Sequence, residues 1–300
     1  MLQLIKPDTK IDFVGNRKYA FVFSGVLIAL SLALLLGAGP KYGIDFAGGT
    51  LLHVRFQDAG EIGAIRNALG DLGADVSVQE FGATKGEYLL RVPQVESDAG
   101  KMGDRITQAL RKSFGSAFEV LRTETVGPRV GSELRQKAVL AVLFATIMMG
   151  AYIWVRFELR FGLGAAIALL HDVIVTAGAL VLFGYEFDLT IVAALLTVVG
   201  FSVNDTVIVS DRIRENMRRS RRQTLPLVIN ASINETLSRT ILTTGTALLV
   251  LVALYFLGGN VIHGFAFALL VGFTIGTYSS IFVASPVVLS LDRASSARAT

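Results

Sequence analysis

Long apolar runs dominate this sequence and decide what it can fold into. A helix needs about 20 mostly apolar residues to cross the hydrocarbon core of a bilayer. Six runs meet that requirement, at residues 19–38, 138–155, 161–183, 189–210, 240–257 and 264–289. The composition agrees, because 52% of the residues are hydrophobic, only 17% are charged, and the mean hydropathy is +0.58. The sequence therefore predicts an α-helical polytopic membrane protein with six transmembrane helices.

The first and last apolar runs support two further predictions. The first run is too long for the apolar part of a cleavable signal and lacks a small-residue cleavage site, so we expect it to remain as a span. The last run contains Pro286, which predicts a kink or an early end of that helix. The chain has no cysteine and 3 histidines, which excludes disulfides and makes a metal or other cofactor site unexpected.

A polar segment of α+β character separates the first two spans. Residues 43–56 and 117–127 have β-rich patterns, and residues 76–81 and 87–92 alternate like paired strands. Two amphipathic helices are predicted between these strands. The first has an apolar face on Ile62, Ile65 and Leu69, and the second begins at a cap on Ser97 or Asp98. The order βαββαβ predicts an inserted ferredoxin-like domain at 39–137. The rest divides into a tail and first span at 1–38, spans two to six at 138–290, and a tail at 291–300.

Lysine and arginine in the short loops predict the orientation, because cytoplasmic loops carry an excess of both residues. The loops after the third and fifth spans contain only Glu186 and Asp188 as charged residues. The basic residues gather on the other side, at Lys6, Lys10, Arg17, Lys18, Arg156, Arg160, Arg212, Arg214, Arg218, Arg219, Arg221, Arg222, Arg293 and Arg298. We therefore expect cytoplasmic termini and a periplasmic insert.

A basic loop is predicted at residues 211–239. Six arginines beside a membrane favour a topology signal and contact with anionic lipid headgroups, while a contact with protein or RNA stays open. The apolar face on Leu225, Val228, Ile229, Ile233 and Leu237 predicts a helix lying in the membrane interface. The insert has 13 Lys or Arg against 13 Asp or Glu, so we expect no nucleic-acid partner.

Asp205, near the end of the fourth span, is the main candidate for chemistry. A carboxylate at membrane depth costs roughly 2.5–3.5 kcal/mol on insertion scales and by default marks an ion or proton pathway. Ser202 lies one turn earlier and Asn204 is adjacent, so this helix offers a polar face. The alternative is a protonated carboxyl that only joins helices. Arg239 opens the fifth span at a similar depth and is the expected partner of Asp205, with Thr243 one turn further on.

Two other motifs need an interpretation. His171 and Asp172 lie near the centre of the third span, and Asp172 is a second proton-relay candidate. Because neighbours on a helix point about 100° apart, we do not expect these two to form one site. The segment GIDFAGGT lacks the lysine and spacing of a phosphate-binding loop. It predicts a tight turn from the membrane into the sheet, in which Asp45 caps local backbone.

These motifs, in this order, resemble the SecF family, the six-span accessory subunits of the bacterial Sec protein translocase. The resemblance rests on GIDFAGGT, LLHDV, GFSVNDTVIVSDRIREN and INETLSRTILTT and covers nearly the whole chain. Its signature glycines and neighbours are Gly43, Asp45, Phe46, Gly48 and Gly49. Six spans rather than twelve imply a separate SecF and not a fused SecDF.

The resemblance implies an RND-type membrane fold that pairs with SecD and associates with SecYEG and often with YajC. It implies use of the proton-motive force to help move unfolded preproteins across the inner membrane, with Asp205 and Arg239 on the proton pathway. No hydrolase, metalloprotease or kinase motif occurs in the sequence, so we expect no enzyme. An RND-type transporter of lipids or small molecules, and a passive scaffold, remain as alternatives.

Overall fold

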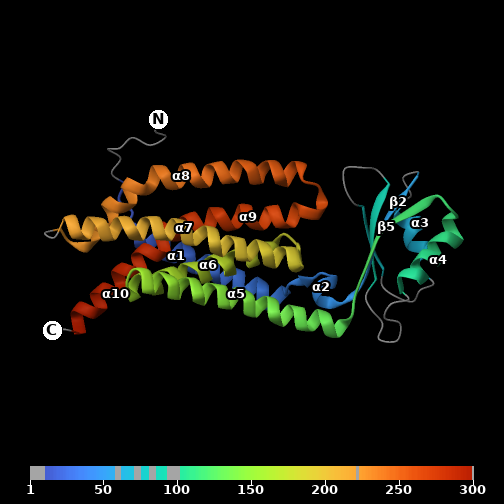
Figure 1. The fold of residues 1–300 in the computed structure, drawn as a ribbon, viewed down its shortest axis with the longest axis horizontal. Helices are drawn as coiled ribbons and strands as arrows, with labels where there is room; N and C mark the ends of the chain where they lie inside the picture. The colour runs from blue at the N-terminus through green and yellow to red at the C-terminus, as the bar shows by residue number, and fades with distance from the viewer. Residues whose placement is uncertain are drawn as a thin grey trace.

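A computed structural model describes residues 11–57, 62–70, 76–80, 86–92, 102–220 and 223–298. It shows a long helical bundle with a small α/β domain at one end (Figure 1). Within the described residues, six helical segments are long and apolar enough to cross a membrane, which confirms the predicted number of spans. They run over Arg17–Ala38, Pro128–Arg156, Leu159–Leu182, Leu189–Arg219, Leu225–Leu257 and Val261–Asp292.

The first and last spans contain irregular turns. Helix α1 (Arg17–Ala33) ends in a π-helical turn, η1 (Leu34–Ala38). The last span consists of α9 (Asn260–Ser279), a π-helical turn η3 (Ser280–Ala284) and α10 (Ser285–Arg298). Pro286 lies just after η3 and has no N–H to donate to the preceding turn, which agrees with the predicted irregularity.

The other four spans are single helices: α5 (Pro128–Arg156), α6 (Leu159–Leu182), α7 (Leu189–Arg219) and α8 (Leu225–Leu257). Helix α5 therefore begins well before the predicted residue 138. The predicted basic loop at 211–239 was wrong, because α7 continues to Arg219 and α8 already begins at Leu225. Arginine and glutamate are good helix formers, so a polar stretch leaving the membrane continues the helix.

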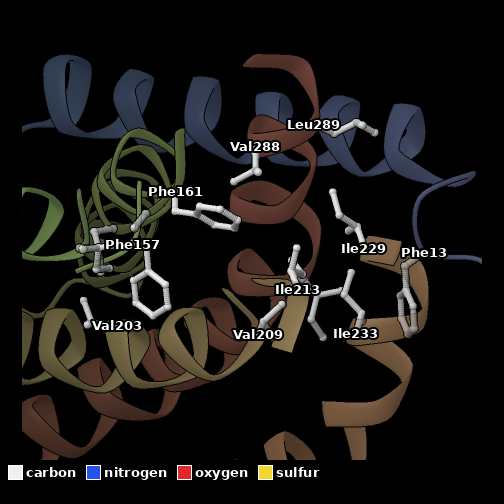
Figure 2. Close-up of a cluster of buried hydrophobic side chains, with 14 of the residues drawn as sticks. Phe13, Phe157, Phe161, Val203, Val209, Ile213, Ile229, Ile233, Val288 and Leu289 are labelled. Carbon is white, nitrogen blue, oxygen red and sulfur yellow. The ribbon is translucent and has the colours of Figure 1, made fainter. Parts of the chain in front are cut away.

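The predicted interfacial helix was also wrong as a separate element. Its residues form the first turns of α8, and its apolar face packs on the protein itself. Phe13, from the segment before α1, and Ile229 and Ile233, from α8, belong to one buried cluster. Figure 2 shows that this cluster also draws side chains from α7, α10 and the α5–α6 connection, including Ile213, Val288 and Phe157. The cluster therefore packs together the ends of these helices that lie away from the sheet.

The small domain follows the predicted βαββαβ order. Its elements are β2 (Gly49–Phe56), α3 (Ile62–Ala68), β3 (Ser77–Glu80), β4 (Glu87–Val92), α4 (Met102–Phe114) and β5 (Phe118–Val126). The strands pair in the order β3-β4-β2-β5, and all neighbours are antiparallel. This is the ferredoxin-like arrangement. The predicted cap at Ser97 or Asp98 lies outside the described residues.

One face of this sheet packs against its two helices. Leu52 and Leu90, which are paired across β2 and β4, are fully buried together with Ile65 of α3 and Ile106 of α4. Figure 1 shows both helices on the side of the sheet that faces away from the bundle. The other face of the sheet is therefore turned towards the membrane helices (Figure 1).

Three short elements connect the domain to the bundle. Strand β1 (Lys41–Tyr42) and the one-turn helix α2 (Ile44–Ala47) lie between the first span and β2. Strand β6 (Glu186–Phe187) lies in the connection between α6 and α7 and pairs in parallel with β1.

Candidate functional site

Asp172 lies in a fully buried polar cluster where α6, α7 and the last span meet. Its side chain has no exposed surface. Its Oδ2 accepts hydrogen bonds from Ser202 Oγ of α7 at 2.6 Å and from Ser279 Oγ of α9 at 2.8 Å. Its Oδ1 lies 2.9 Å from Nδ1 of His171. Three polar partners from three helices therefore hold this carboxyl group, and both of its oxygens are engaged.

His171 and Asp172 thus form one site, contrary to the sequence prediction. The two Cα–Cβ bonds diverge around the helix, but the imidazole ring is long enough to turn back to the neighbouring carboxyl group. His171 is itself buried, and its Nε2 has no hydrogen-bond partner among the described residues. The pair therefore combines a titratable acid with a titratable base in the interior of the bundle.

A glycine lets the helices approach closely at this cluster. A Cβ atom on Gly276 of α9 would lie 3.0 Å from Ser202 Cβ and 3.5 Å from Asp172 Oδ2. Small residues at helix contacts allow backbones to approach in membrane proteins. Gly276 therefore sets the distance over which the hydroxyl groups reach the carboxyl group.

Asp205 is held much more loosely than Asp172. It is 1% exposed, and its Oδ2 is reached by Thr244 Oγ1 of α8 at 3.5 Å and by Thr277 Oγ1 of α9 at 3.4 Å. Both distances lie near the limit for a hydrogen bond. The two threonine hydroxyls are 2.8 Å from each other. Asp205 Oδ1 has no hydrogen-bond partner in the described part of the chain.

The predicted partners of Asp205 are placed differently. Among the described residues, Asp205 and Arg239 form no ion pair within 4.0 Å, and Arg239 is exposed. The direct ion pair is not formed in this structure because the contact face of α8 falls on Thr240 and Thr244, while Arg239 lies beside that face. Thr243 is half-buried and lies next to this face, and Asn204 is exposed. Ser202, expected beside Asp205, binds Asp172 instead.

Arg239 instead lines an open cavity of about 560 Å³ at the end of the bundle remote from the sheet. Thr236 and Val207 line the same cavity. Thr236, Thr240 and Thr244 follow at intervals of four residues and are all buried on α8. Thr240 Oγ1 is another buried atom without a hydrogen-bond partner in the described ranges. This row of threonines extends from Thr236 in the cavity wall to Thr244, which contacts Asp205.

The last span contributes hydroxyl groups to the polar interior that were not predicted from the sequence. Thr277, Ser279 and Ser280 come from the run GTYSS, and all three take part in the polar interior. Ser280 Oγ lies 2.9 Å from Thr206 Oγ1 of α7. The run was readable as a signal, since four hydroxyl side chains in five residues are unusual in an otherwise apolar span.

The glycine motif forms a turn, as predicted, but Asp45 does not cap local backbone. Gly48 has a φ of +77°, and a Cβ there would lie 2.9 Å from Pro128 Cα, so only glycine fits. Asp45 Oδ2 accepts a hydrogen bond at 3.0 Å from the N–H of Leu189, at the start of α7. Phe46 is buried. The motif therefore joins segments far apart in the sequence.

No group of three or more His, Cys, Asp or Glu side chains suited to a metal ion occurs within the described residues. Among the described residues of the helical bundle, the buried acidic and basic side chains are two single carboxyl groups on neighbouring helices and one histidine. Chemically, such an arrangement can bind and release protons, and it can change helix contacts when it does so.

Comparison with known proteins agrees with this architecture. A family model for the C-terminal region of the SecD/SecF protein export membrane proteins matches residues 106–294. A second model, the SecD/SecF GG motif, matches residues 33–59. The second match contains the turn at Gly48 and Asp45.

Curated relatives match over nearly their full length. Protein translocase subunit SecF of Desulfurispirillum indicum is 47% identical over 282 residues, which covers 92% of this chain and 90% of the relative. The SecF subunit of Magnetococcus marinus is 49% identical and covers 97% and 95%. That of Escherichia coli O157:H7 is 41% identical and covers 93% and 87%.

Among solved structures, SecDF of Thermus thermophilus, a translocon-associated membrane protein, has a TM-score of 0.83 and 38% identity. This chain is covered over 97% of its length and spans 40% of the SecDF chain. A super-membrane-facing form of SecDF gives a TM-score of 0.74 at 37% identity. The chain belongs to the SecD/SecF family, as a relative of the SecF subunits of protein translocase.

Proposed function

We propose that this protein couples the proton-motive force to protein translocation, as the SecF partner of a SecD subunit beside the SecYEG translocon and YajC. Family membership supports the translocase role, and the solved SecDF chain supports the pairing with SecD. In this proposal the chain performs no covalent chemistry. It lies in the bacterial inner membrane with cytoplasmic termini and a periplasmic small domain, and its arginine-rich helix ends contact anionic lipid.

One observation carries the proposal: Asp205 is buried and loosely held. Its oxygen Oδ1 has no partner among the described residues, and its oxygen Oδ2 has only two long contacts. Asp172, by contrast, is held by short hydrogen bonds that must open before it can exchange a proton. An acid with an unoccupied oxygen can instead accept and release a proton without breaking a strong network.

The proposed route to Asp205 starts at the open cavity beside Arg239. The buried hydroxyls of Thr240 and Thr244 continue it along α8. Hydroxyl groups both donate and accept hydrogen bonds, so a row of them can order water or pass a proton. Arg239 at the cavity wall would influence the charge state of Asp205 from a distance rather than through a salt bridge.

Asp172 is the second member of the proposed pathway. It is connected to the helix of Asp205 through Ser202, which lies one turn before Asp205 on α7. A proton would reach Asp172 only when the contacts of Ser202 and Ser279 open. The energy available is about 2.3 kcal/mol for one charge crossing 100 mV. This is comparable to one or two such hydrogen bonds, so it can bias a rearrangement of α6, α7 and α9.

The test uses a translocase reconstituted with its SecD partner, with and without a proton gradient. Asp205→Asn should assemble normally and lose the gradient-driven part of preprotein translocation. Glu133→Gln is the matched control, because this carboxyl group lies on the membrane-spanning helix α5 but is exposed and does not line the cavity. Normal gradient-driven translocation by Asp205→Asn would exclude Asp205 as a proton carrier. Failure of Asp205→Asn to assemble would point to a structural scaffold instead.

A further inference from the structure

The end of α7 opposite the open cavity is attached to the small domain by a continuous set of contacts. Strands β1 and β6 pair in parallel, with Lys41 opposite Glu186 and Tyr42 opposite Phe187. The N–H of Gly43 extends this pairing with a 2.8 Å hydrogen bond to the carbonyl oxygen of Phe187. This pairing joins the segment after the first span to the residues that lead directly into α7.

Two aspartates then share the first turn of α7. Asp188 is the N-cap of the helix, and its Oδ1 accepts from the N–H of Ile191 at 2.8 Å. Asp45 accepts from the N–H of Leu189 at 3.0 Å. The first N–H groups of a helix lack partners within the helix, and the helix dipole favours negative charge there. Asp188 alone satisfies the usual requirement of a helix end, so Asp45 adds a bond that connects two parts of the chain.

The segment that carries Asp45 is rigidly attached to the sheet. Strand β2 begins at Gly49, directly after the turn at Gly48, and that turn packs against the backbone of Pro128. A Cβ on Gly131 of α5 would lie 3.0 Å from the carbonyl oxygen of Phe46, which leaves no room for the turn to shift. From the neighbouring strand β4, Arg91 forms an ion pair with Glu186. Both central strands of the sheet thus reach the α6–α7 connection.

We propose that Asp45 is a positioning residue that transmits movement of α7 to the small domain. The inference rests on the proposed function, because α7 also carries Asp205 and the Ser202 hydroxyl that binds Asp172. A continuous helix is stiff along its axis, so a rearrangement at Asp205 displaces its first turn. The bond from Asp45 makes the sheet follow that displacement. Without this bond, the β1–β6 pairing and the Arg91–Glu186 ion pair still join the two parts, but the small domain follows α7 less closely.

The first experiment compares Asp45→Ala with Asp188→Ala in the reconstituted translocase. Each variant removes one carboxyl group from the same helix end, but only Asp45→Ala removes a hydrogen bond between that helix end and the segment that leads into β2. We expect Asp45→Ala to lose the gradient-driven part of translocation while it still co-purifies with its SecD partner. Asp45→Asn should retain much of it, because an amide oxygen still accepts from the Leu189 N–H. Equal effects of Asp45→Ala and Asp188→Ala would overturn the proposal.

A cross-link gives an independent test. The chain has no cysteine, so Lys41→Cys with Glu186→Cys places a unique pair at facing positions of β1 and β6. Adjacent strands are about 4.8 Å apart, which is compatible with a disulfide. We expect the oxidised pair to restore gradient-driven translocation to Asp45→Ala, and reduction to abolish it again. With Asp45 intact, the reduced pair controls for loss of the Arg91–Glu186 ion pair, and the oxidised pair should leave translocation intact. Inhibition by the cross-link alone would mean that this joint opens during the cycle, and that result would also overturn the proposal.

Asp205→Asn in the same assay separates this inference from the proposed function. Loss of gradient-driven translocation in Asp205→Asn, together with its retention in Asp45→Ala, would refute the role of Asp45 only. Retention in Asp205→Asn would refute proton carriage by Asp205 itself.

Discussion

Replacing Gly276 with alanine tests whether close helix packing positions the hydroxyl groups around Asp172. The new methyl group would lie 3.0 Å from Ser202 Cβ and 3.2 Å from Ser202 Oγ. Both distances are shorter than ordinary van der Waals contact, and the contacted atoms belong to a short side chain on a helix. Ser202 therefore cannot swing away without releasing its 2.6 Å hydrogen bond to Asp172. Either α9 separates from α7 or this bond breaks.

The expected change in the free energy of unfolding combines one of two alternative costs with one gain. Overpacking a close contact costs about 1–3 kcal/mol. Loss of the hydrogen bond to a buried carboxyl group costs about 1–3 kcal/mol if that route is taken instead. Against this, alanine is favoured over glycine inside a helix by about 0.5–1 kcal/mol. We therefore expect a net destabilisation of about 1–2 kcal/mol, which corresponds to a fall in melting temperature of roughly 2–6 °C for a chain of this size.

The assay is thermal unfolding of the purified chain in detergent, with Gly200→Ala as the matched control. Gly200 lies on α7 two residues before Ser202, and a Cβ there would meet nothing within 4 Å. The control should unfold at or slightly above the temperature of the unchanged protein. A melting temperature of Gly276→Ala equal to that of the control would refute the packing argument.

A double variant sharpens the same test. Ser202→Gly removes both the Cβ atom and the hydroxyl group that the new methyl group would meet. If steric conflict is the cause, Gly276→Ala should cost much less in the Ser202→Gly background than in the unchanged chain. Simple additivity of the two effects would instead indicate that the residues do not act on each other.

Three further perturbations test other contacts. Asn230→Ala removes the amide that binds the backbone N–H of Phe13 at 2.8 Å, so hydrogen exchange of residues 11–16 should accelerate; unchanged protection would show that the apolar contacts suffice. The hydrogen bonds from Arg55 lower the pKa of Glu87, so ionised Glu87 stabilises the sheet above its unfolded pKa, and this contribution disappears as the pH falls through its folded pKa. Glu87→Gln should abolish that acid-dependent change in exchange of β4, whereas persistence of the change in the variant would assign it elsewhere. Gly48→Ala should lower the melting temperature more than Gly276→Ala, because it combines a 2.9 Å backbone contact with a positive φ.

The spans and the strand order of the small domain could be predicted because each rests on local periodicity. Lipid demands about 20 apolar residues per crossing, and a half-buried strand such as β4 alternates buried and less buried side chains. The helix ends could not be predicted in the same way, because no rule on hydropathy ends a helix where it leaves the membrane. The arginine-rich end of α7 therefore remained helical.

The partners of the buried acids were not predictable from local sequence. Asp172 is bound by Ser279, 107 residues away, and Asp205 by Thr277, 72 residues away. The sequence places Arg239 and Asp205 at a similar depth in the membrane, and opposite charges attract, so Arg239 was the predicted partner of Asp205. The rotation of α8 decides the outcome, and it directs Thr244 rather than Arg239 towards the carboxyl group. One residue of helical phase changes the neighbour by about 100°.

Helix α7 connects these observations into one physical picture. Its first turn is bonded to the small domain through Asp45, its middle holds Asp172 through Ser202, and Asp205 lies one turn beyond. The hydrogen bonds of Asp45 and Ser202 are 3.0 Å and 2.6 Å long, whereas the contacts of Asp205 are longer, at 3.4–3.5 Å. A change of charge acts most easily where an acid is least constrained, and it is transmitted best through parts that are most constrained. The distribution of strong and weak contacts along α7 therefore supports the proposed proton-driven movement of this helix.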